Sequence, residues 1–396
     1  MSEAARACPL CLQRGAEVLH RQLFVLPDGH PLGRGYDVVC CDACGFVYAD
    51  TRVTQAEYDA YYTRLSKYED PRTGTGGGQQ PWDDARLATT AETLSAFVSD
   101  RDAKLVDVGC ANGGLLRQLG RLGFRRLVGV DPSPRCSATA GAVPGATGHA
   151  GSLFALPPEA CDADAVVLSH VLEHVQELRR GLAAARRLLR PDGIVYVEVP
   201  DATRYADCLA APYQDFNTEH VNHFGPVSLS GLLAREGFEV LAVRRKTIEA
   251  APNVPYPAVY AAGRVRANGA ATAPFTRDTE LRPTVLEYAR RSAELMRALD
   301  EGLATIGGPI LVWGVGQLTF KLLAMTRLSD VPIRAFLDSN PAYHGMTLRG
   351  APILPPEAVS GFTEPVLIGT LLHGDAIEGR LRELGADNAV LWLRGR

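Results

Sequence analysis

The chain has 396 residues, of which 46% are hydrophobic and 22% are charged, and its formal net charge is −4. This length suits two or three domains, and the apolar fraction excludes an intrinsically disordered chain. Arginines occur in short runs separated by acidic residues, so no long basic stripe is available for a nucleic-acid backbone. We therefore expect a globular protein without a nucleic-acid or membrane partner. The first ten residues contain no apolar signal segment, which favours a cytoplasmic location.

Cysteines are concentrated at the start of the chain, where residues 1–50 hold five of the nine. Two Cys-x-x-Cys motifs each place two thiols on one tight turn, and two such turns can supply the tetrahedral site that zinc favours. In a cytosolic chain this spacing indicates a metal rather than disulfides, with Cys40 as a spare that can compete with its neighbour. We predict a structural zinc in a module over residues 1–50. The expected ligands are Cys8, Cys11, Cys41 and Cys44.

Two helical stretches are predicted next. Residues 53–70 are rich in tyrosine, a glycine-rich break follows at 73–81, and a second helix extends to about residue 98. We expect residues 51–100 to form a helical lid or linker.

Strands and helices alternate from residue 104 to about 245, and residues 101–248 are therefore predicted to form a parallel sheet with helices on both faces. Residues 249–304 are expected to be a connecting helical segment that ends in a long amphipathic helix over 280–304. A second alternating set follows, so residues 305–396 are predicted to be a second Rossmann-like domain. The predicted fold class is α/β.

A glycine-rich turn connects the first predicted strand of residues 101–248 to its helix. Gly109 permits a tight turn, and Gly113 can let the backbone approach a ligand at the helix N-terminus. The next strand ends in Asp131, whose carboxylate can accept both hydroxyls of a ribose. A nicotinamide dehydrogenase would share these features, but the motif from His170 to His174 after a later strand favours another family.

Together these residues resemble the class I methyltransferase fold, with Ala111 in place of the usual middle glycine. The resemblance implies S-adenosylmethionine as the cofactor. Ser152 stands where the family often has an acid beside the adenine. The expected cofactor-binding residues are Asp107, Gly109, Ala111, Gly113, Asp131, Ser152, Leu153 and Ser169.

Polar residues are dense in the segment from 215 to 224, which follows the fifth predicted strand and so lies on the rim where ligands bind in such sheets. The pair Glu219-His220 can provide a general base, because imidazole titrates near neutral pH. A structured loop that caps the helix starting near Pro226 is the alternative interpretation.

The combination of a cysteine module, a methyltransferase core with a Glu-His loop and a second Rossmann-like unit resembles the sugar C-methyltransferases. These enzymes act on thymidine-diphosphate-linked 4-keto sugars in antibiotic biosynthesis. The resemblance implies that His220 removes the proton alpha to the ketone with support from Glu219, and that no catalytic metal is required. It also implies roles for His174 and for Tyr62 or Tyr68. We add Asn217 and Asn222 as candidate substrate contacts, although Asn217-Thr218 replace the Tyr-His of the family.

The C-terminal unit carries its own Gly-x-Gly turn, at Gly314 and Gly316, and an acid, Asp338, at the end of the next strand. These residues can hold the nucleotide of a small-molecule substrate, or the unit can be an empty Rossmann domain that only packs. Three alternatives to C-methylation stay open. They are an O-methyltransferase of a sugar or natural product, a zinc-ribbon RNA methyltransferase, and a nucleotide-sugar binding protein whose methyltransferase half is inactive, which the intact cofactor turn and the Glu219-His220 pair disfavour. We expect a monomer or a homodimer.

Overall fold

The computed structural model describes residues 4–65, 76–266 and 275–393. The chain splits into two compact units. The first unit comprises Met1–Leu19, Val38–Cys208 and Glu219–Val285, and the second comprises His20–Asp37, Leu209–Thr218 and Leu286–Arg396. Each unit is therefore assembled from segments that are far apart in the sequence.

The first unit is built on a seven-stranded sheet in the order β10-β11-β8-β7-β4-β5-β6. The five strands from β8 to β6 are parallel, whereas β11 runs antiparallel to both of its neighbours. The strands are β4 Lys104–Val108, β5 Arg126–Asp131, β6 Ala146–Ala150, β7 Ala163–Ser169, β8 Leu189–Pro200, β10 Phe238–Ala251 and β11 Val254–Val265. The predicted α/β class I methyltransferase core is confirmed by this arrangement.

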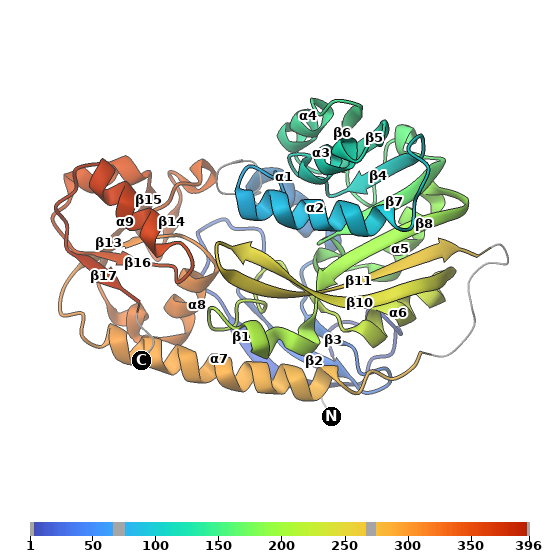
Figure 1. Ribbon diagram of the computed structural model, residues 1–396. Helices are drawn as coiled ribbons and strands as arrows, with labels where there is room; N and C mark the ends of the chain where they lie inside the picture. The colour runs from blue at the N-terminus through green and yellow to red at the C-terminus, as the bar shows by residue number, and fades with distance from the viewer. Residues whose placement is uncertain (1–3, 66–75, 267–274, 394–396) are drawn as a thin grey trace. The chain divides into compact units, whose positions relative to one another are not determined.

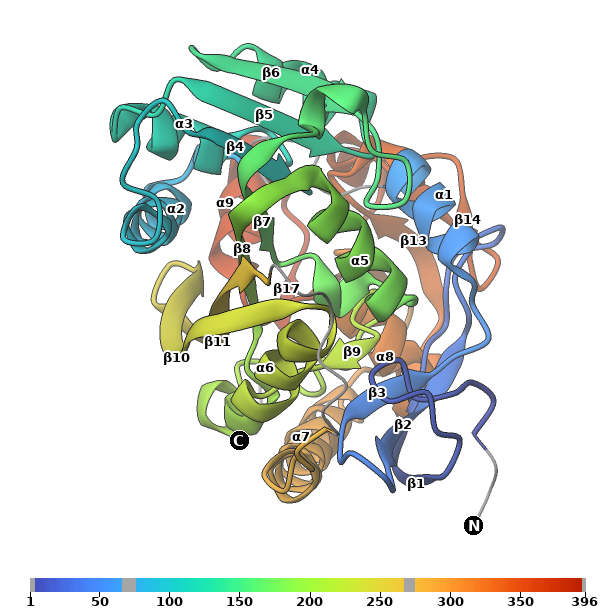
Figure 2. The ribbon, with the colours of Figure 1, turned by 90° about the vertical axis from the view of Figure 1, so that its right-hand side faces the viewer.

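Helices cover both faces of this sheet, with α2 and α3 on one face and α5 on the other (Figures 1 and 2). Because alternate strand residues point to opposite faces, one core forms where Leu105 and Val167 meet Leu94 of α2 and Leu116 of α3. The helices are α2 Pro81–Ser95, α3 Gly114–Arg121, α4 Pro134–Gly141, α5 Leu178–Leu188 and α6 Pro226–Arg235.

The expectation of a connecting helical segment over residues 249–304 is wrong for its first part, where β11 forms. Ala258–Ala262 are buried and pair with β8, in the strand next to the edge strand β10. Two prolines, Pro255 and Pro257, disfavour a strand in this stretch, because proline removes a ladder hydrogen bond. Both prolines lie in the first part of β11, which pairs only with β10, because the register with β8 begins at Ala258. The long helix predicted at 280–304 is confirmed as α7 Leu281–Leu303.

The N-terminal residues form a small sheet in the order β1-β2-β3-β9, with β1 Ala16–Leu23, β2 Gly35–Cys41, β3 Val47–Asp50 and β9 Asn222–His223. Strand β3 pairs antiparallel with β9 through Val47–His223 and Tyr48–Asn222. Helix α1, Gln55–Leu65, follows β3. The strand that follows the Glu219-His220 pair is thus joined to the cysteine module by backbone hydrogen bonds.

The second unit contains a six-stranded sheet in the order β14-β15-β13-β12-β16-β17, in which only β14 is antiparallel. Trp313, Leu337 and Val366 lie in its core, and the predicted second Rossmann-like fold is confirmed. Its elements are β12 Ile310–Trp313, α8 Gln317–Met325, β13 Ile333–Leu337, β14 Thr347–Leu348, β15 Ala351–Leu354, β16 Val366–Ile368, α9 Gly374–Glu383 and β17 Val390–Trp392.

Candidate functional site

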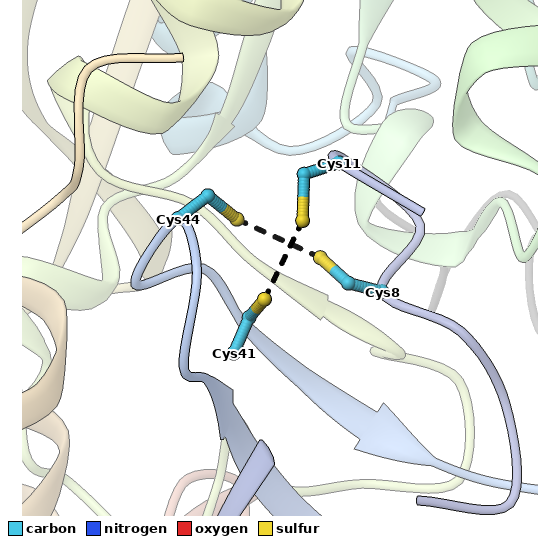
Figure 3. Close-up of side chains that lie close together, drawn as sticks. All are labelled: Cys8, Cys11, Cys41 and Cys44. Atoms are coloured by element: carbon cyan, nitrogen blue, oxygen red, sulfur yellow. Dashed lines mark hydrogen bonds between the residues drawn. The ribbon is translucent and has the colours of Figure 1, made fainter. Parts of the chain in front are cut away.

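The four cysteines of the two Cys-x-x-Cys motifs converge on one point (Figure 3). Sγ of Cys8 lies 3.7 Å from Sγ of Cys44, Sγ of Cys11 lies 3.4 Å from Sγ of Cys41, and all four sulfurs lie within 4.8 Å of one another. Thiolates bound to zinc at about 2.3 Å in a tetrahedron are separated by about 3.8 Å. The quartet therefore has the donor type and the spacing of a structural zinc site.

Cys40 does not belong to this quartet. Its Sγ lies 3.6 Å from the carbonyl of Gly45, and burial raises the pKa of its thiol to about 11. Successive residues of a strand point to opposite faces, so Cys40 and Cys41 on β2 cannot both face the other cysteines. Strand geometry thus decides that Cys41, and not Cys40, joins the other three cysteines, a choice that the spacing in the sequence leaves open.

A cavity of about 360 Å³ opens in the first unit and is lined by residues that follow β4, β5 and β7. This is the edge of the sheet at which open α/β folds bind ligands. The expected cofactor residues that line it are Asp107, Gly109, Ala111, Asp131, Ser152, Leu153 and Ser169.

The turn after β4 is closed by the carboxylate of Asp131. Its two oxygens accept the N–H groups of Ala111 and Ser133, each at 2.9 Å. A carboxylate can accept several hydrogen bonds at once, so Asp131 can fix the turn and still be a polar group of the cavity. The turn requires left-handed backbone at Gly109 (φ 79°) and at Ala111 (φ 44°), and glycine adopts that conformation most easily.

Gly113 packs against α4. It does not line the cavity, and a Cβ at this position would lie 2.8 Å from the Cα of Ala140. The missing side chain lets α3 pack closely on α4. Gly113 also adopts a left-handed conformation at the N-cap of α3, which glycine adopts most easily, and its contact with a cofactor stays a prediction.

Asp107 is a buried acid inside this cavity. Burial, with the negative charge of Asp131 added to it, raises the pKa of Asp107 to about 7. A carboxyl group in that state gains most from a cationic ligand, because an adjacent positive charge stabilises the ionised form.

Arg86 and Trp82 of α2 also line the cavity, and the sequence carries no signal that could have identified them. Arg86 is bound to Asp83, with Nη2 2.7 Å from Oδ1, and the other oxygen of Asp83 accepts the N–H groups of Gly76 and Gly78. The guanidinium is therefore held in a fixed orientation, and it is a cation within reach of an anionic ligand group.

His170 is a further residue that our sequence analysis did not assign. It lines the cavity, with Nδ1 3.1 Å from Glu173 and Nε2 3.5 Å from Glu198. Burial would lower the pKa of His170, but the two carboxylates outweigh burial and raise it. Burial would likewise raise the pKa of Glu198, but His170 and the Lys246 ammonium at 2.5 Å lower it.

The two residues of the Glu219-His220 pair differ in position: His220 lines the cavity, whereas Glu219 is buried and does not line it. His220 lines the cavity together with His174 and Tyr62, and the His174 and His220 rings make an edge contact with centroids 4.9 Å apart. Glu219 is only 3% exposed, and its carboxylate accepts hydrogen bonds from Tyr61 at 3.2 Å and Tyr62 at 3.4 Å. Its carbonyl lies 3.1 Å from Nδ1 of His174.

Several candidate residues are not brought to this cavity. Asn222 is buried, and its amide donates to the carbonyls of Leu172 and Val175, which makes it a structural residue. Asn217 belongs to the second unit, where its carbonyl accepts the hydroxyl of Tyr36. Tyr68 lies outside the described residues.

In the second unit, Asp338 closes the Gly314-Val-Gly316 turn. Its oxygens accept the N–H groups of Val315 at 2.6 Å and Asn340 at 2.7 Å, and burial raises the pKa of its carboxyl group. Asp131 bonds in the same way in the first unit. The two Rossmann-like units therefore share one local structure at the expected nucleotide position, although the role of the second one stays a prediction.

Comparison with known proteins agrees with the fold. Residues 80–243 match the family model described as "Methyltransferase domain". A probable S-adenosylmethionine-dependent methyltransferase of Mycolicibacterium smegmatis is 31% identical over 90 residues, which are 23% of this chain and 34% of that protein. The chain thus spans about a third of the length of this curated relative.

Two solved structures are also similar. The 1,6-didemethyltoxoflavin-N1-methyltransferase of Burkholderia thailandensis, bound to its substrate and S-adenosylhomocysteine, is 20% identical with a TM-score of 0.43, over 56% of this chain and 95% of that chain. An S-adenosylmethionine-dependent methyltransferase of Mesorhizobium loti is 20% identical with a TM-score of 0.37, over 45% of this chain and 99% of that chain. No helix within the described residues is long and apolar enough to cross a membrane.

Proposed function

We propose that this chain, whose residues 80–243 match a methyltransferase domain, is an enzyme that transfers a methyl group from S-adenosylmethionine to a carbon of a nucleotide-linked keto sugar. The observation that carries the proposal is that one cavity contains both a ribose-type cradle at Asp131 and an imidazole at His220. A cofactor and a proton acceptor can therefore meet in one cavity.

The cofactor is expected to lie across the strand ends. Asp131 would receive the ribose hydroxyls, because its carboxylate lies at the cavity at the end of β5. Asp107 and Arg86 would receive the ammonium and the carboxylate of the methionine part, because they supply one negative and one positive group in the same cavity.

Carbon methylation needs a positioned base, since a carbon acid beside a ketone is a weak acid at neutral pH. In the proposed reaction, His220 takes the alpha proton and the resulting enolate carbon attacks the methyl group. The new carbon–carbon bond forms as the bond from methyl to sulfur breaks, and S-adenosylhomocysteine leaves. His174 and the Tyr62 hydroxyl line the same cavity and are the groups available to stabilise the enolate oxygen.

Zinc would be held by the four cysteines and would act structurally. The second Cys-x-x-Cys turn leads into β3, and β3 pairs with β9, which begins two residues after His220. A closed four-thiolate site has no open position for a substrate. Its expected contribution is therefore to keep the segment that carries Glu219 and His220 in place.

The decisive experiment incubates the purified chain with S-adenosylmethionine and a panel of nucleotide-linked keto sugars, with the corresponding alcohols as matched controls. Mass spectrometry and carbon NMR of the products would report the methylated atom. We expect a new carbon-bound methyl group alpha to the ketone and no product from the alcohols. Methylation of the alcohols at oxygen would instead establish the O-methyltransferase alternative, and methylation of RNA alone would contradict the proposal.

A further inference from the structure

We propose that Glu173, His174 and His220 form a second metal site, which binds a divalent transition-metal ion inside the cavity and is separate from the four cysteines. One ligand atom from each of these residues lies within 4.8 Å of the other two. All three residues line the cavity, so an ion bound there would face the space proposed for the substrate. Two imidazoles and one carboxylate form a donor set that suits zinc, cobalt, manganese or iron(II).

The ligand side chains are oriented by a second layer of contacts. The carbonyl of Glu219 lies 3.1 Å from Nδ1 of His174, so a proton on Nδ1 leaves the lone pair on Nε2. That Nε2 lies 3.9 Å from Oε1 of Glu173. Ligand histidines in metalloproteins usually donate their other ring N–H to a carbonyl or carboxylate, and this arrangement fixes the tautomer that binds.

Glu173 supplies an independent indication. It is 1% exposed, and its Oε1 is held by Nδ1 of His170 at 3.1 Å. Its Oε2 is buried and has no hydrogen-bond partner among the described residues. Because a buried carboxylate oxygen without a partner is costly, a cation bound at the Glu173 carboxylate would reduce a penalty that the cavity otherwise retains.

The surrounding scaffold holds the three ligands on short connected segments. Glu173 and His174 lie in the one-turn helix Leu172–His174 after β7, and the N–H of Val221, next to His220, donates to the carbonyl of Glu173. The backbone therefore keeps His220 beside the other two ligands without any metal.

Binding at this site has a consequence that rests on the proposed function. A lone pair that coordinates a metal ion cannot accept a proton, so His220 cannot act as the base while the ion is bound. The site is thus an inhibitory one, in which a divalent metal and the alpha proton of the sugar compete for the same imidazole.

The test uses the full chain with zinc already bound to its cysteines, titrated at pH 8 with Co²⁺ and followed by visible absorption. Cobalt in a nitrogen and oxygen site gives weak d–d bands, whereas cobalt on thiolates adds strong charge-transfer bands in the near ultraviolet. We expect saturable d–d bands without charge-transfer bands and without zinc release. His174→Gln and His220→Asn should each weaken Co²⁺ binding by at least about 10–100-fold, the loss known for outer-shell changes alone.

His149→Ala is the matched control, because His149 and Glu159 also form a His–Glu pair, at 3.9 Å, but lack a third ligand and lie outside the cavity. Retained zinc and S-adenosylhomocysteine binding would show that each variant is folded. Absent d–d bands, equal affinity in the His174 and control variants, or thiolate bands with zinc release would overturn the site.

A separate measurement isolates the inhibitory consequence. Wild type with keto sugar and S-adenosylhomocysteine in deuterated water should exchange the alpha proton, and Co²⁺ should stop this exchange reversibly. Exchange that continues at saturating Co²⁺ would leave the metal site intact and would contradict His220 as the base.

Discussion

Asp107 makes cofactor binding dependent on pH in a direction that the structure determines. Its pKa is raised to about 7 by burial and by Asp131, against an ordinary value of 3.8. The ammonium group of the cofactor would bind the ionised carboxylate, so affinity should rise with pH as Asp107 loses its proton. With a pKa of about 7, the ionised fraction rises from about one in eleven at about pH 6 to about one half at about pH 7.

The cofactor should therefore bind about fivefold more tightly at about pH 7 than at about pH 6, a difference of about 1 kcal/mol in binding free energy. Calorimetry with S-adenosylhomocysteine measures it, and repeating the titration in buffers of different ionisation enthalpy reports proton release on binding. Asp107→Asn is the control, because it keeps the shape and removes the titration. Its affinity should be lower and nearly constant over this range. Equal slopes for wild type and Asp107→Asn would refute the assignment.

The raised pKa of Asp107 affects the stability of the unliganded protein in the opposite direction: affinity rises with pH, whereas stability falls. Between about pH 4 and pH 7 the folded chain retains a proton on Asp107 that the unfolded chain has lost. Stability therefore decreases as pH rises through this window, since the folded state binds more protons. Asp107→Asn should remove that part of the slope in urea unfolding, and an unchanged slope would show that Asp107 is not the group responsible.

Four further predictions follow from the sites. Elemental analysis should find about one zinc per purified chain, and Cys8→Ser with Cys44→Ser should abolish it, whereas zinc retained by that variant would contradict the four-thiolate site. Asp131→Ala should weaken S-adenosylhomocysteine binding by about 1–3 kcal/mol in calorimetry, because buried N–H groups lose their acceptor; unchanged affinity would place the ribose elsewhere. His220→Asn should lower kcat by about 10²–10⁴-fold with cofactor affinity intact, and near-normal turnover would exclude it as the base. Asp338→Ala should raise KM for the sugar nucleotide more than KM for S-adenosylmethionine, while equal small effects would favour a C-terminal unit that only packs.

Most of the predictions made from the sequence rest on short-range patterns. The two Cys-x-x-Cys motifs, the turn at Gly109 and the acid at Asp131 each depend on a few neighbouring residues whose geometry follows from backbone sterics and ligand chemistry. The alternation of apolar strands and amphipathic helices likewise indicated the α/β core, because periodicity reports burial. The five-part division of the chain stays a prediction, since the two compact units interleave segments from across the sequence.

Long-range contacts decided what these patterns did not reveal. Arg86 faces the cavity only because α2 packs beside the sheet, and Gly113 contacts α4 only because Ala140 lies against it. Glu219 and Tyr61, which are 158 residues apart, are brought within hydrogen-bond distance by the fold. Strand β11 is stabilised by its position between β8 and β10 despite two prolines. In each case the deciding free energy comes from burial and pairing with a distant segment. Local propensity and residue spacing contain no information about such contacts.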